Sequence, residues 1–134
     1  MSLDVYLDDE CRFQFDDNDA YWLLHPEYRF QFDDNAVYWF LHPWFWQLHK
    51  SIGKYIDLYG GVTFSAADDL SLLIQAMDEA KISAENQPQE LPVAVAIGRY
   101  EKIHRSVLLA EIIKFQALLE EAKITGKTLN FVGD

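Results

Sequence analysis

Apolar and polar residues alternate in two short stretches at the start of the chain, which is the pattern of strands with one buried face. The stretches are residues 3–7 and 11–15, and the three acids at 8–10 between them can form a turn. We therefore expect an N-terminal hairpin made from these two stretches.

A tandem repeat of 17 residues overlaps the second stretch. Residues 12–28 read RFQFDDNDAYWLLHPEY and residues 29–45 read RFQFDDNAVYWFLHPWF, identical at 12 of 17 positions. Each unit contains an alternating stretch that predicts a strand, an Asp-Asp-Asn turn that supplies helix caps, and an aromatic stretch that begins a helix. Two such units cannot fill one position in a core, so either the fold has two equivalent sites or one unit is expelled or swapped.

Proline and glycine divide the segment after the repeat turn. The residue before a proline disfavours the α region, so a helix over 36–41 is expected to stop before Pro43. A second helix is expected over 44–51, ending at Gly53, because glycine is the usual residue just past a helix end.

The next stretch is rich in β-forming residues. Residues 54–59 precede Gly60-Gly61 and then 62–64, a pattern that favours a hairpin. The alternative is a longer helix through Tyr59 that ends at the two glycines.

Helical spacing of apolar residues predicts helices over 66–85 and 99–125. The apolar arc of the second helix is wide, so that helix is expected to be central to the core or shared with a second subunit. Short apolar runs predict strands at 93–97 and 128–132. The expected sheet consists of residues 54–59, 62–64, 93–97 and 128–132.

These elements predict an α+β fold in which a small, mostly antiparallel sheet is covered by helices, with the tandem repeat at the N-terminal side. The length of 134 residues fits a single domain spanning 1–134, and an apolar content of 50% favours a packed core over a disordered chain.

The charge of the chain narrows the class of partner. The formal net charge is −11, from 22 acids against 11 bases. Such a field repels nucleic acid and anionic membranes and favours a basic protein partner, although acidity can also serve solubility alone. The single cysteine, Cys11, excludes an internal disulfide, and the N-terminus has no signal-peptide pattern, so a cytoplasmic location is expected.

The residues that could hold a metal ion do not have metal-site spacing. His25 and His42 each lie in Leu-His-Pro, His49 follows seven residues after His42, and Cys11 has no partner cysteine. The acidic turns lack the glycine and the distal glutamate of a calcium loop and are better explained as helix caps. We therefore expect no metal ion and no cofactor. No nucleophile motif or phosphate loop is present either.

Aromatic residues and acids gather in the repeat region. The tryptophans can pack in the core or form a protein-binding face, and the aspartates can steer a basic partner by long-range attraction. The residues expected to bind the partner are Asp16, Asp17, Asp33, Asp34, Trp22, Trp39, Trp44 and Trp46.

Two other functions fit the sequence. One is a small enzyme or ligand-binding domain with a pocket beside the sheet, which would use Asp57, Tyr55, His49 or His104. The other is a domain whose repeat drives formation of a homodimer, because a duplicate unit that cannot dock in its own chain can dock on a neighbour.

Short motifs from the second repeat unit onward suggest a family. They are DNAVYWFL at 34–41, GKYIDLYG at 53–60, Phe64 and FVGD at 131–134. On these motifs, residues 34–134 resemble small uncharacterised bacterial proteins placed among toxin-immunity candidates. The resemblance implies an immunity-type protein that occludes a toxin domain, with no catalytic residues to carry over, and implies that one repeat unit is extra.

Overall fold

The computed structural model describes residues 2–8, 28–32, 35–65 and 67–133. Four strands form an antiparallel sheet in the order β2-β1-β6-β3. Two further strands, β4 and β5, form a separate hairpin. The strands are β1 (Leu3–Asp8), β2 (Phe30–Phe32), β3 (Gly61–Phe64), β4 (Glu90–Ala96), β5 (Arg99–His104) and β6 (Thr128–Gly133). The helices are α2 (Asn35–Ile52), α3 (Ala67–Glu85) and α4 (Arg105–Thr125).

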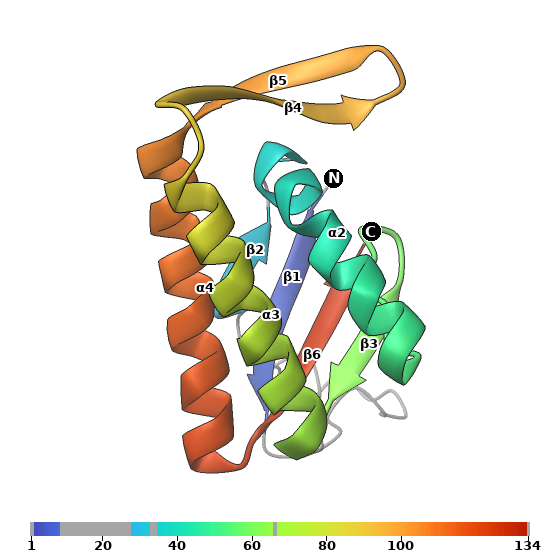
Figure 1. Cartoon of the computed structure of the whole chain (residues 1–134). Helices are drawn as coiled ribbons and strands as arrows, with labels where there is room; N and C mark the ends of the chain where they lie inside the picture. Colours follow the sequence, from blue (N-terminus) through green and yellow to red (C-terminus); the bar gives the residue numbers. More distant parts are fainter. Residues whose placement is uncertain (1, 9–27, 33–34, 66, 134) are drawn as a thin grey trace.

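The three helices lie on one face of the four-stranded sheet, and the β4–β5 hairpin stands at one end of the helical layer (Figure 1). Alternation along the central strands explains this arrangement, because Leu3, Val5 and Leu7 of β1 are buried while Asp4 and Tyr6 between them are partly exposed. The buried side chains point to the helices. Phe115 of α4 meets Phe30 and Phe32 of β2 and Phe131 of β6, with ring centroids 5.0 to 6.1 Å apart.

The second repeat unit supplies one edge of the sheet and most of a helix. Its strand residues Phe30 and Phe32 are buried, and β2 pairs with β1 in the register Val5 to Phe30 and Leu3 to Phe32. Its helix contributes Tyr38, whose hydroxyl donates a 2.7 Å hydrogen bond to the carbonyl of Ile56. The described part of the chain thus has a position for unit 29–45, whereas residues 12–27 of the first unit lie outside it.

The expected N-terminal hairpin pairs residues 3–7 with residues 11–15, and residues 11–15 lie outside the described ranges. At residues 3–5, however, both edges of β1 are occupied, by β2 on one side and by β6 on the other. The partner of β1 at these positions is therefore the strand of the second unit.

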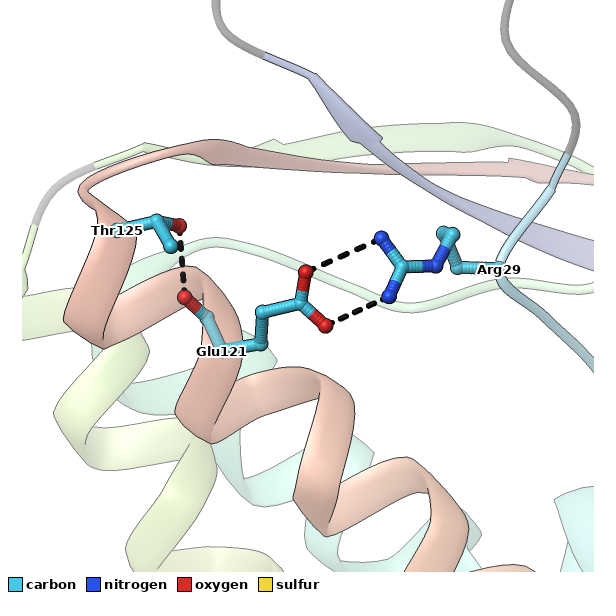
Figure 2. A network of polar contacts seen from close by, with 3 residues as sticks. All are labelled: Arg29, Glu121 and Thr125. Carbon is cyan, nitrogen blue, oxygen red and sulfur yellow. Dashed lines mark hydrogen bonds and ion pairs between the residues drawn. The ribbon is translucent and has the colours of Figure 1, made fainter.

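An ion pair ties this edge of the sheet to α4 (Figure 2). The guanidinium of Arg29 donates two hydrogen bonds to the carboxylate of Glu121, at 2.6 and 3.1 Å, and the Thr125 hydroxyl donates to the backbone carbonyl of Glu121. Both charged side chains are exposed, so the pair fixes geometry more than it adds stability.

The helix break expected before Pro43 does not occur. Helix α2 continues through this proline from Asn35 to Ile52. An interior proline removes one backbone hydrogen bond and costs about 3 kcal/mol. Burial of Leu41, Phe45 and Leu48 on a single face of α2 compensates, because one continuous helix is needed to place all three in the core.

Two other expected elements are wrong. Residues 54–59 form a loop and a turn rather than a strand, although Ile56 and Leu58 within them are buried. Residues 99–104 form β5 rather than the first turns of a helix, and α4 begins at Arg105. As a result, the strand expected at 93–97 pairs with β5 and does not belong to the main sheet.

The remaining elements are confirmed in kind. Helix α3 and strands β3, β4 and β6 lie where the apolar spacing predicts them, within a few residues. The wide apolar arc of α4 is only partly buried, since Val107 and Ile113 are about half exposed. Among the helices of the described ranges, none has the length and apolar character needed to cross a bilayer.

Candidate functional site

Three of the eight residues expected to bind a partner lie in the described part of the chain, and all three are tryptophans of α2. Trp39 and Trp44 are partly buried, and Trp46 is 44% exposed. The other five residues, Asp16, Asp17, Asp33, Asp34 and Trp22, lie outside the described residues.

The structure separates these tryptophans onto two flanks of α2. Trp39 and Trp46 both contact His42, at ring-centroid distances of 4.9 and 6.2 Å. Trp44 instead contacts Phe40, at 5.8 Å, and lines a groove between α2 and α3. The positions 39, 42, 46 and 49 recur every three or four residues, which places them on one helical face. They could have been recognised from the sequence as a face only by treating the helix as continuous through Pro43.

We call this flank the aromatic face and define it as Trp39, His42, Trp46, His49 and Tyr55. The first four belong to α2, and Tyr55 comes from the loop that follows that helix. Tyr55 packs edge-on to Trp46 and His42, with centroid distances of 5.5 and 5.8 Å, and lies 5.2 Å from His49. Each ring of the face therefore contacts at least one other ring, and Tyr55 contacts three of them: His42, Trp46 and His49.

A hydrogen bond fixes the centre of the aromatic face. The Nε2 atom of His42 and the hydroxyl of Tyr55 are 2.8 Å apart. Burial lowers the pKa of His42 below its ordinary value, and the nearby carboxylate of Asp57 partly offsets this shift. The imidazole of His42 is therefore neutral at pH 7 and contributes a ring rather than a positive charge.

Tyr38 anchors the face from below. It is fully buried and its hydroxyl bonds the Ile56 carbonyl, which ties α2 to the loop that carries Tyr55 and Asp57. Burial raises the pKa of the Tyr38 phenol strongly, and the neighbouring Tyr55 and Asp57 raise it further. The Tyr38 phenol therefore stays neutral and has a structural role. Its hydrogen bond to the Ile56 carbonyl helps to hold the loop that carries Tyr55 against α2.

Negative charge is unevenly distributed along the chain. Residues 1–34 contain ten acids and two bases, whereas residues 35–133 contain eleven acids and nine bases. The part of the structure that carries the aromatic face is thus close to neutral by itself. Most of the acidic excess belongs to residues 1–34, which precede α2 in the sequence.

The residues expected to line an enzyme pocket are only partly brought together. Tyr55 and Asp57 share a loop and His49 contacts Tyr55, but His104 lies on β5, 3.7 Å from Glu90. Two grooves of about 390 Å³ each are found between α2 and α3 and between α3 and α4, and neither is lined by these residues. Within the described ranges, no cluster of three or more His, Cys, Asp and Glu side chains has the arrangement of a metal site.

Comparison of the chain with family models, with curated proteins and with solved structures found no match.

Proposed function

We propose that the protein is an acidic binding protein of immunity type, which sequesters a basic protein partner by occluding it and does not catalyse a reaction. The aromatic face of α2 carries this proposal. It combines an exposed tryptophan with a second tryptophan, a tyrosine and two histidines, and tryptophan and tyrosine are enriched at the residues that dominate binding energy in protein interfaces.

The packing of the face supports a binding role. The rings contact one another from two chain segments, and the His42–Tyr55 hydrogen bond and the Tyr38–Ile56 hydrogen bond hold those segments together. A face that is already rigid loses little conformational entropy when a partner docks, so more of the contact energy remains as affinity.

The charge supports the choice of a basic partner. A net charge of −11 raises the rate of encounter with a positively charged protein, and the effect weakens as salt screens it. The resemblance to immunity candidates points the same way, because such a protein must associate fast and dissociate slowly. We place this function in the cytoplasm, where a chain with one cysteine stays reduced.

The proposal can be tested by capture from a lysate of the source organism with three immobilised proteins: the wild type, Trp46→Ala and Trp44→Ala. The second variant is a matched control, because Trp44 lies on the same helix but outside the aromatic face. A basic protein retained by the wild type and by Trp44→Ala, but bound at least roughly tenfold more weakly by Trp46→Ala, is the expected result. Equal capture by all three proteins, or capture of acidic proteins only, would contradict the proposal.

The steering component has its own test. Asn substitutions at Asp16, Asp17, Asp33 and Asp34 together should slow association with the captured partner, most strongly at low salt. An association rate that is the same for both proteins at every ionic strength would show that these four acids do not steer the partner.

A further inference from the structure

The outer side of α4 presents apolar side chains to solvent. Val107 and Ile113 are about half exposed and Ile124 is largely exposed, whereas a surface helix normally turns such residues to the core. With the exposed Ala110 and Ala117 they recur at intervals of three, four or seven positions, so all five share one side of the helix. We call these five residues the α4 stripe. Neither the core nor the aromatic face uses it.

The α4 stripe lies away from the aromatic face. Helix α3 lies between α4 and α2, the helix that carries that face (Figure 1). Ile113 and Ala117 also line the groove of about 390 Å³ between α3 and α4, so the surface is hollowed beside the centre of the stripe. A molecule docked on the stripe therefore leaves the aromatic face open.

Charge distinguishes α4 from the helix beside it. Helix α3 carries five acids and one base, whereas α4 carries three acids and three bases. A basic partner is attracted to α3 rather than to the neutral α4. The surface that complements the stripe has an apolar ridge with both signs of charge beside it, and α4 of a second copy has these properties.

An antiparallel pair of α4 helices matches the charges beside the stripe. Lys114 and Glu121 are seven residues apart, which is about two helical turns, so they lie on one flank. A twofold axis midway between them brings Lys114 of each copy level with Glu121 of the other. The Glu121 carboxylate already accepts two hydrogen bonds from Arg29, so Lys114 of the second copy extends an existing ion pair.

The same axis brings the apolar residues of the stripe together. It places Ala117 against Ala117 of the second copy, where two small side chains allow the helix axes to approach closely. Ile124 of each copy lies beside Ile113 of the other, at the edge of the α3–α4 groove. Each of these contacts occurs twice, because a twofold interface uses the same residues from both copies.

We infer that the α4 stripe is the interface of a homodimer, in which two α4 helices pack antiparallel about Ala117. This inference goes beyond the proposed function and does not depend on it. The dimer carries two aromatic faces, one on each copy, so it can hold two partners at once and bind a multivalent target with higher avidity.

Sedimentation velocity of the full chain tests the interface. At physiological salt the repulsion between two acidic copies is screened beyond about 8 Å. The wild type should form a dimer as its concentration rises through roughly 5–500 µM, and Ile113→Glu should weaken the dimer at least roughly tenfold. Ile97→Glu is the matched control, because Ile97 is also an exposed isoleucine, lies at the turn between β4 and β5, and gains the same charge. It should form a dimer as the wild type does.

A charge exchange tests the antiparallel arrangement. Lys114→Glu places two acids at each of the two contacts, and Glu121→Lys places two bases there. Each single variant should weaken the dimer by about twofold to thirtyfold, the range for two exposed ion pairs. The double variant Lys114→Glu/Glu121→Lys restores opposite charges across the interface and should regain the affinity. A residue that only supports the fold of its own chain does not show this recovery.

Circular dichroism checks the fold of every variant. Ala117→Glu changes an exposed position at the centre of the interface and gives the same test should Ile113→Glu unfold. A wild type that stays monomeric at every concentration, or a dimer as strong in the Ile113→Glu and Ala117→Glu variants as in the wild type, would overturn the inference. A double variant that stays as weak as the single variants would also overturn it. Capture of a basic partner through Trp46 is a separate measurement, so either proposal can fail while the other stands.

Discussion

A matched pair of deletions tests which repeat unit the fold uses. One variant lacks residues 12–28 and the other lacks residues 29–45, so each keeps one unit, the two have equal length, and they differ at five positions. The structure places unit 29–45 in the sheet edge and in α2. Deletion of residues 12–28 should therefore preserve the domain, and deletion of residues 29–45 should force the first unit into a position that does not suit it.

Three of the five differing positions are buried in the structure, and these three determine how much stability the variant that lacks residues 29–45 should lose. Ala36, Val37 and Phe45 are at most 2% exposed, and the first unit has Asp19, Ala20 and Tyr28 in their places. Truncating the valine costs about 2 kcal/mol through lost contacts and a cavity. Burying an unpaired carboxylate costs about 3 kcal/mol, of which up to about 1 is regained because an acid in the first helical turn meets the helix dipole.

The buried phenol at the Phe45 position adds about 1 kcal/mol if its hydroxyl finds no partner. Because these positions are neighbours, their costs do not simply add, and we take about 4 kcal/mol as the expected loss. Against a typical total of roughly 5–15 kcal/mol, this loss brings the domain close to unfolding.

Deletion of residues 12–28 should raise the free energy of unfolding slightly rather than lower it. It shortens the connection between the paired residues Val5 and Phe30 from 24 residues to seven. A shorter loop is easier to close by (3/2)RT times the logarithm of that ratio, which is about 1 kcal/mol. This variant should be as stable as the full chain or slightly more stable.

Urea unfolding followed by circular dichroism gives both free energies. The expected difference between the two deletion variants is about 4 kcal/mol in favour of the one that keeps residues 29–45. Equal stability of the two variants, or greater stability of the variant that keeps residues 12–28, would refute the assignment of the second unit to this position.

Three further predictions concern single side chains. Tyr38→Phe should lower the free energy of unfolding by about 1–2 kcal/mol in urea titrations, because the Ile56 carbonyl loses its buried donor. Arg29→Ala should change the same quantity by less than about 1 kcal/mol, since the pair with Glu121 is exposed; a larger loss would mean that the pair stabilises the fold. Burial lowers the pKa of His42 in the folded protein, so the unfolded chain takes up the proton first as the pH falls, and stability should decrease as the pH drops through about 6.5. His42→Gln should flatten that pH dependence, and an unchanged slope would show that another group causes it.

The sequence predicts elements well where one period of apolar residues dominates, as in α3 and β6. It is misleading where a stretch satisfies two patterns. Residues 99–104 contain one buried apolar residue, Ile103, which fits a helix or a strand, and only pairing with β4 decides between them. Residues 54–59 have strand-like composition, but Ile56 and Leu58 are buried from a loop whose path is set by the contact with Tyr38.

The sequence predicts the candidate site only in part. The sequence identifies the tryptophans of α2 as candidate binding residues. Because a helix break is expected at Pro43, however, it does not predict that Trp39, His42, Trp46 and His49 share one helical face. Tyr55 joins that face through a tertiary contact that no local pattern indicates. Local rules therefore identify the residue types of a surface, and long-range packing decides which of them meet.

The two longest strands of the main sheet, β1 and β6, pair along their whole lengths, from Leu3 opposite Gly133 to Asp8 opposite Thr128. A ribosome that adds about 5–20 residues per second needs on the order of ten seconds to travel from one strand to the other. Among the strands of the described ranges, β2 is the neighbour of β1 that is already synthesised during this interval, and the edge of β1 that pairs with β6 is still without its partner. The edge of β1 at the middle of the future sheet therefore stays unpaired until β6 is synthesised, and an unpaired edge strand favours aggregation. A chaperone that shields Leu3, Val5 and Leu7 would act during this interval, when the protein is most prone to aggregate.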